Sequence, residues 1–230
     1  MGLSTDSVVF SHTQRAFVDK KTGKRLRGIT RLIAKLCTRP SALDFPPFVP
    51  AGKRRAKAKP FGKTDGKRVD AAITTAIVRH NTKRPALRKK KVCSRSPEAK
   101  QFFASLAKHG LRPVRAQLVV WHETARIATA IDVVAKDSNG GTVIIEVKCG
   151  YQGTFRLKNG TVKPTRLANS PFVLACVQAC VGADLYARTA QVTPTRIIVA
   201  HITRSAVRLH DVPGHILRRM NVICESIYKM

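Results

Sequence analysis

The chain has 230 residues and a large excess of positive charge: 43 lysines and arginines stand against 13 acidic residues, giving a formal net charge of +30. Hydrophobic residues make up 43% of the sequence, which is enough for a folded core and excludes a chain that is disordered throughout. Such a charge repels itself in a compact state unless a polyanion relieves it, so nucleic acid is the expected partner.

No segment is apolar enough to span a bilayer, and no secretory signal is recognisable at the N-terminus. We therefore expect no membrane partner and an intracellular protein of the nucleus, an organelle or a virion. The six cysteines show no zinc-finger spacing and are expected to be free thiols. We interpret the chain as a single domain, 1–230.

Residues 1–50 are predicted to form an N-terminal hairpin and a helix. Polar and apolar residues alternate from residue 7, and the sequence turns at Lys21-Thr22-Gly23-Lys24. Helical spacing then runs from Ile29 through Leu36. The prolines of residues 38–50 indicate a loop.

Residues 51–95 form a basic stretch, interpreted as a DNA-binding insertion. Its middle, VDAAITTAIVRH, has the apolar spacing of a helix, and its flanks are cationic and interrupted by proline and glycine. Such runs are also found in solvated tails and nuclear-targeting patches, and both interpretations stay open. The residues expected to contact DNA are Lys53, Arg54, Arg55, Lys67, Arg68, Lys89, Lys90 and Lys91.

Residues 96–230 are predicted to form the catalytic core, an α/β unit with a central mixed sheet flanked by helices. Ser96-Pro97-Glu98 has the features of a helix start, and that helix should end near Gly110. Alternation and turn residues predict the remaining elements. These are strands at 113–121, 127–135 and 142–149, a helix at 170–189, strands at 196–201 and 206–212, and a terminal helix from Pro213 onward.

Two acidic residues interrupt apolar strands: Asp132 in AIDVV and Glu146 in VIIEVK. A carboxylate inside such a strand is costly to bury unless it is paired or binds a cation. Lys148 follows Glu146 by two residues and should share its sheet face. A hairpin turn at Asn139-Gly140-Gly141 should bring Asp132 close to both.

This grouping suits hydrolysis of a phosphodiester. Asp132, Glu146 and the Val147 carbonyl could hold Mg²⁺ or Mn²⁺, and Lys148 could orient the attacking water. Each residue also has a structural interpretation, since Asp132 could lie on an exposed edge and Glu146 and Lys148 could form an ion pair of little value.

The pattern ID-x13-E-V-K on a predicted hairpin resembles the PD-(D/E)XK nuclease superfamily, and most closely its RecB/lambda-exonuclease-like branch. The segment SHTQRAFVDKKTGKRLRGITRLI resembles the opening hairpin of that branch, and PFVLACVQACVGADLY its post-catalytic helix, with Gln178 at the position of the active-site glutamine. The resemblance implies a restriction-endonuclease-like core and a Mg²⁺-dependent deoxyribonuclease, by preference an exonuclease, in replication, recombination, repair or genome processing.

The sequence departs from this family at several positions. Gln117 occupies the position of a common upstream glutamate, for which Glu123 could substitute unless it is exposed to solvent. Asp70 stands where histidine is common, and Gly182 stands where tyrosine is common. Tyr151 could stack on a base.

The departures leave a second function open, a non-catalytic basic DNA-binding or packaging protein derived from a nuclease. An RNA-associated protein is a third interpretation, which explains the charge but not the carboxylates within strands. The sequence does not determine the oligomeric state.

Overall fold

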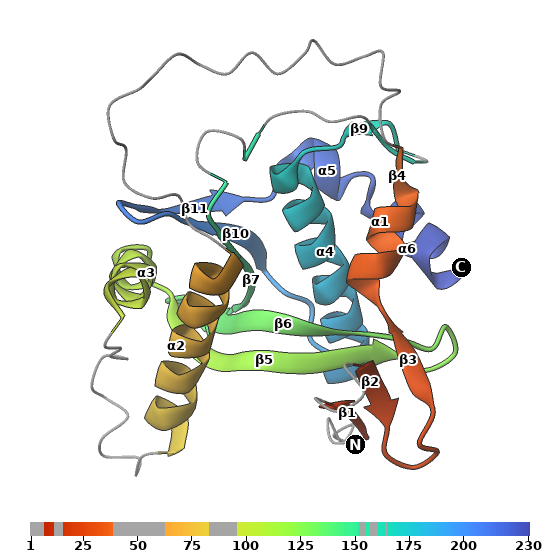
Figure 1. Ribbon diagram of the computed structural model, residues 1–230, viewed down its shortest axis with the longest axis horizontal. Helices are drawn as coiled ribbons and strands as arrows, with labels where there is room; N and C mark the ends of the chain where they lie inside the picture. The colour runs from red at the N-terminus through yellow and green to blue at the C-terminus, as the bar shows by residue number, and fades with distance from the viewer. Residues whose placement is uncertain are drawn as a thin grey trace.

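A mixed β-sheet forms the centre of the structure (Figure 1), a computed structural model in which residues 7–11, 16–38, 63–82, 96–151, 155–156, 161–163 and 165–230 are described. The strands lie in the order β1-β2-β3-β6-β7-β10-β11, and β5 pairs with β6. The pairs β3–β6 and β7–β10 are parallel and the others are antiparallel. The strands are β1 (Val8–Ser11), β2 (Ala16–Asp19), β3 (Arg25–Gly28), β5 (Arg112–His122), β6 (Ile127–Lys136), β7 (Thr142–Cys149), β10 (Arg196–Ile202) and β11 (Val207–Asp211).

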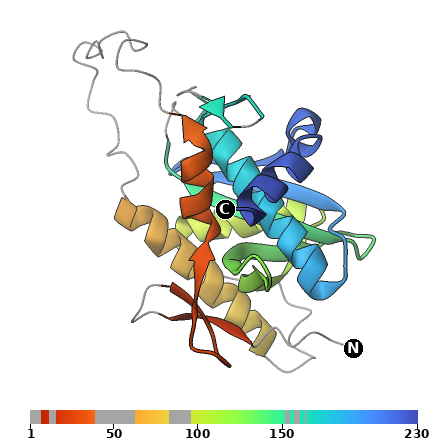
Figure 2. The same cartoon turned by 90° about the vertical axis from the view of Figure 1, so that its right-hand side faces the viewer.

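Helices cover both faces of the sheet (Figures 1 and 2). On one face α4 (Pro171–Ala190), α1 (Ile29–Leu36), α5 (Gly214–Leu217) and α6 (Met220–Tyr228) pack over a core cluster that includes Ile144. On the other face α2 (Lys63–Thr82) and α3 (Pro97–Lys108) pack over a cluster that includes Ile145. Consecutive residues of β7 thus point to opposite faces, as a strand buried on both sides requires. A small second sheet joins β4 (Cys37–Thr38), β8 (Thr161–Val162) and β9 (Leu167–Ala168).

The predicted fold class is confirmed: the protein is α/β, with a large mixed sheet between helices, consistent with a restriction-endonuclease-like core. The predicted helix start at Ser96 is also confirmed, because its hydroxyl accepts a hydrogen bond from the Ala99 N–H. The predicted hairpin turn after β6 is fixed by Asp137, whose carboxylate accepts the N–H of Gly141 at 2.7 Å.

Helix α2 is part of the core. Val69, Ile73 and Ile77 are at most 1% exposed and pack with α3 against the sheet. This part of the 51–95 stretch therefore supplies one of the two helices described on that face. The basic residues to either side of α2 lie outside the described residues.

The terminal helix predicted from Pro213 onward is wrong as a single element. The chain forms α5 and then α6, with Arg218 and Arg219 between them. The Arg219 N–H donates to the carbonyl of Ile216, three residues back, and this tighter turn redirects the chain. As a result Ile216 and Ile223 are both fully buried against the same core.

Candidate active site

The candidate site lies at a fork in the sheet. One edge of β6 pairs with β5 along nearly its whole length. Its other edge pairs with β3 at Ile127–Ala128 and with β7 at Val133–Lys136. Between these two partners lie Thr129–Asp132, where β7 has separated from β6. Helix α4 closes one side of the fork, since a side chain at Gly182 would come within 3.5 Å of Ile131.

Asp132 lies at the point where β6 and β7 separate. Its Oδ2 accepts a hydrogen bond of 2.8 Å from the Val147 N–H of β7. In an extended strand the N–H and the carbonyl of one residue point to the same edge, so the Val147 carbonyl also faces the fork. The predicted proximity of Asp132 to the end of β7 is thus confirmed.

Glu146 and Lys148 lie together on the face covered by α4. The Lys148 Nζ is 2.5 Å from Glu146 Oε1 and 3.1 Å from Gln178 Oε1, and Gln178 comes from α4. Glu146 is only 4% exposed. Glu146 and Lys148 therefore form the ion pair that the structural interpretation expected, although the carboxylate is buried, and one hydrogen bond connects the lysine to α4. Asp132 is partly buried and does not lie on an exposed edge.

Burial makes this cluster electrostatically costly when no cation is bound. It raises the pKa of Asp132, and burial together with the charge of Asp132 raises the pKa of Glu146 to about 8. Burial alone would lower the pKa of Lys148, but the carboxylates of Glu146 and Asp132 raise it. A cation between the carboxylates would favour their ionised forms.

Asp70 of α2 is a third acid at this site, which the sequence reasoning noted as a departure but did not count as a site residue. Burial raises its pKa to about 6, and the charge of Asp132 contributes. Helix α2 passes close to the end of β7 at Gly66, where a Cβ would lie in van der Waals contact with the Cβ of Cys149, at 3.5 Å. The segment Gly66–Asp70 was the signal in the sequence, but its place opposite Asp132 depends on tertiary packing.

One amide connects the two aspartates. Gln117 Nε2 donates to Asp70 Oδ1 at 3.1 Å and to Asp132 Oδ1 at 3.3 Å. Gln117 has a φ of +50°, the left-handed region that residues other than glycine rarely adopt within a strand. This residue therefore holds two carboxylates together from a strained backbone position. Glu123 is exposed in the turn between β5 and β6, the alternative that the sequence left open to a role in the site.

These donors fit a magnesium or manganese ion in type, because carboxylate and carbonyl oxygens are hard ligands. Within the described ranges, no three His, Cys, Asp or Glu side chains converge closely enough to form a metal centre by themselves. A cation here would be held by Asp132, Glu146 and the Val147 carbonyl, with water completing its coordination. The Lys148 ammonium now lies against Glu146 Oε1 and would have to share that carboxylate.

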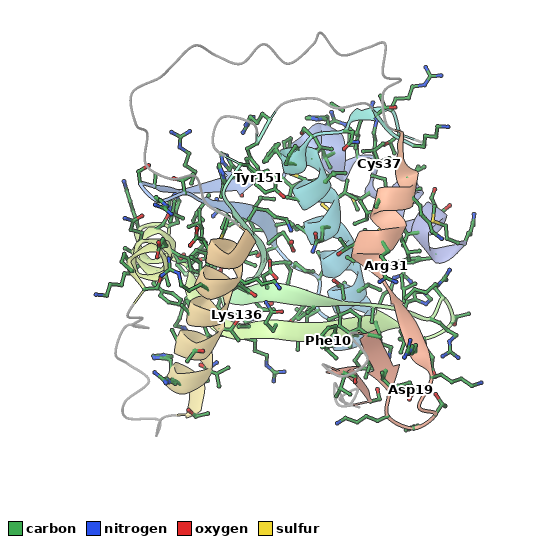
Figure 3. The ribbon with its side chains drawn as sticks, in the orientation of Figure 1. Phe10, Asp19, Arg31, Cys37, Lys136 and Tyr151 are labelled. Atoms are coloured by element: carbon green, nitrogen blue, oxygen red, sulfur yellow. The ribbon has the colours of Figure 1, made fainter. Side chains whose placement is uncertain are left out.

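The residues expected to bind DNA are only partly described. Lys67 is exposed on α2, and Arg68 forms an ion pair of 3.0 Å with Glu98. Tyr151 lies just beyond the end of β7 (Figure 3) and is 44% exposed. The centroid of its ring is 5.7 Å from that of the Phe155 ring. Lys53, Arg54, Arg55, Lys89, Lys90 and Lys91 lie outside the described residues.

Comparison with known proteins identifies no family. No protein-family model matches the chain, and no curated protein matches it. Among solved structures, the chain is similar to that of SSO0001, at 15% sequence identity over 70% of this chain and 74% of the other, with a TM-score of 0.28. A likeness that weak carries no argument about function. In the part of the chain described here, no helix combines the length and apolarity needed to cross a membrane.

Proposed function

We propose that the protein is a Mg²⁺-dependent deoxyribonuclease that hydrolyses phosphodiester bonds in DNA. The observation that carries this proposal is the grouping at the fork between β6 and β7. Lys148 bonds to Glu146, Asp132 accepts from the N–H of the residue between them, and the charge of Asp132 acts on both. A buried and a partly buried carboxylate beside an ammonium group are costly to assemble for stability alone. Their charges are complementary to a nuclease substrate complex, because carboxylates bind a divalent cation and an ammonium group binds a phosphate or an attacking water.

Each residue has a distinct task. Asp132, Glu146 and the Val147 carbonyl would hold the cation, which when bound stabilises charge on the phosphate and lowers the pKa of a water molecule. Lys148 would orient that water and neutralise charge that develops on the phosphate oxygens. Gln178 keeps the ammonium in position through its Oε1. Gln117 donates to Asp132 and is itself positioned by its hydrogen bond to Asp70 of α2.

DNA is the partner that we propose, because the net charge of +30 favours a polyanion. Lys67 and Tyr151 are exposed on elements that contribute to the site, where they could contact a phosphate and a base. A nuclease of this type would act in the nucleus, in an organelle or in a virion, during replication, recombination, repair or genome processing.

The test is a Mg²⁺ titration against end-labelled linear and nicked duplex DNA, with wild type, Lys148→Ala and Lys136→Ala compared. Lys136 is a matched control, since it lies in the same hairpin and its Nζ bonds to Thr142 Oγ1 instead of an acid. We expect Mg²⁺-dependent cutting by wild type and Lys136→Ala, and a loss of about 100-fold or more in Lys148→Ala. Equal cutting by all three proteins would remove the proposed centre.

A second candidate is a DNA-binding or packaging protein that has lost catalysis. It is favoured by Gln117, which supplies an amide where the resembling nucleases carry an acid, so the site has one negative charge fewer on β5. Tight, salt-sensitive DNA binding by wild type without metal-dependent cutting would select this function.

A further inference from the structure

An open groove of about 560 Å³ lies between β1, the C-terminal half of α2 and β5. Pockets of roughly 300–1,000 Å³ commonly hold small ligands or parts of larger ones. The groove is bounded by three elements that are distant in sequence and lie together in the fold (Figure 1). One of its lining residues, Gln117, also belongs to the candidate active site.

The groove reaches the candidate active site through Gln117. This residue lines the groove, and its amide also donates to Asp132 and Asp70. Helix α2 makes a second connection, because it carries Asp70 at the cluster and, two turns further on, Ile77 and Val78 at the groove. A chain that occupied the groove would therefore have one end close to the carboxylates.

The walls of the groove present apolar side chains to solvent. Phe10 is 41% exposed, Val9 36% and Val78 49%, which are among the most exposed large hydrophobic residues described. Phe10 lies beside β5 (Figure 3), with its ring edge-to-face with Phe17 at 5.3 Å between centroids. An exposed aromatic ring on an apolar wall offers a stacking surface to a planar partner.

The charge of the groove favours a polyanion. None of the described residues that line it is acidic, and Arg115 of β5 lines it with an exposed side chain. Arg79 is exposed on α2 next to Val78. Apolar walls with cationic margins match a nucleic acid strand, whose bases are planar and whose backbone is anionic.

We propose that this groove binds the unpaired end of a DNA strand and directs it to the carboxylates. The inference rests on the proposed function and names its substrate: DNA ends whose bases are separated from the opposite strand. A groove of about 560 Å³ matches one or two unstacked nucleotides in size. Phe10 stacks on a base, Arg115 contacts a phosphate, and Val78 forms the opposite wall.

The experiment compares two exposed valines on helices. Val78→Glu places an acid in the groove, and Val222→Glu places the same charge on α6, where the valine is 50% exposed. Binding of labelled oligothymidylate is measured by fluorescence anisotropy in Ca²⁺ or EDTA, so that cleavage is not needed for a signal. The control ligand is a dumbbell duplex, which is closed by a loop at both ends and therefore has no strand end to enter the groove.

We expect Val78→Glu to weaken binding of oligothymidylate by roughly tenfold or more relative to Val222→Glu, because one base contact is lost and a like charge is added. The two variants should bind the dumbbell equally. Phe10→Ala, which changes no charge, should also weaken binding of the single strand selectively. It provides the test if Val78→Glu proves unfolded by circular dichroism.

Equal affinities of both glutamate variants for oligothymidylate would overturn the proposal, as would an equal loss on the dumbbell. Failure of the groove and failure of the nuclease are distinguishable. If wild type cuts DNA but the groove variants bind oligothymidylate normally, the proposal for the groove is wrong and the catalytic proposal stands. If wild type does not cut but Val78→Glu selectively loses the single strand, the groove is a DNA site of a non-catalytic protein.

Discussion

Replacement of Glu146 by glutamine should reduce the pH dependence of stability near neutral pH and leave the part that comes from Asp132 and Asp70, whose pKa values are also raised. Glu146 is 4% exposed, and burial and the charge of Asp132 raise its pKa from 4.5 to about 8. The folded protein therefore holds this proton more tightly than the unfolded chain does. Stability is greatest below the unfolded pKa and falls as the pH rises towards the folded pKa.

The size of the effect follows from these two values. The gap between 4.5 and about 8 corresponds to a free energy of about 5 kcal/mol between the two ends of the range. Glutamine has no proton to lose, so this contribution to the pH dependence is absent from the variant. Lys148 still has Gln178 as a hydrogen-bond partner and Asp132 as a nearby charge in this variant.

The assay is urea unfolding in EDTA at about pH 5, 7 and 8.5, the interval over which the linkage acts. Wild type should lose several kcal/mol of unfolding free energy across the series, as the linkage predicts, whereas Glu146→Gln should lose less. Added Mg²⁺ should restore stability to wild type most strongly at the highest pH, where the carboxylates are charged. An identical pH slope in the two proteins would refute the reasoning.

Three further variants test the fold and the site. Ile73→Ala should lower the free energy of unfolding by about 2–5 kcal/mol in urea melts, because this α2 side chain is 1% exposed in the core; a surface-like loss below about 0.5 kcal/mol would contradict the packing of α2. Gly141→Ala should cost about 1–3 kcal/mol by the same assay, since its Cβ would lie 2.5 Å from Asp137 Oδ2 and 2.6 Å from Thr195 Oγ1; an unchanged midpoint would argue against the tight turn. Asp70→Asn should weaken Mn²⁺ binding by about tenfold in calorimetric titrations, because it removes a charge next to Asp132. An unchanged affinity would show that Asp70 of α2 does not contribute to the site.

The sequence was most informative where the signal was local. Alternation within β7 placed Glu146 and Lys148 on one face, and the turn residues at 137–141 predicted the hairpin that brings Asp132 to them. These inferences needed only the periodicity of a strand and the chemistry of one turn. They held because β6 and β7 are neighbours in the chain as well as in the sheet.

The remaining features depend on long-range packing. Asp70 reaches Asp132 only because α2 crosses the end of β7, and no local pattern specifies that crossing. The left-handed φ of Gln117 could not be predicted either, because the residues around it alternate between apolar and polar as in an ordinary strand. The break between α5 and α6 could not be predicted, because the two residues between the helices, Arg218 and Arg219, are neither proline nor glycine. The break depends instead on the burial of Ile216 and Ile223 in the same core.

Direct titration of Mn²⁺ into the protein, followed by the loss of the free-ion electron paramagnetic resonance signal, tests whether the fork holds a divalent cation. Asp132→Asn should remove the strongest binding site seen in wild type, because Asp132 Oδ2 lies against the Val147 N–H at the fork. Glu123→Gln is the matched control, since it removes an exposed acid in the turn after β5 and should bind as wild type does. Identical Mn²⁺ binding by wild type and Asp132→Asn, or equal losses in both variants, would contradict a metal centre built on Asp132.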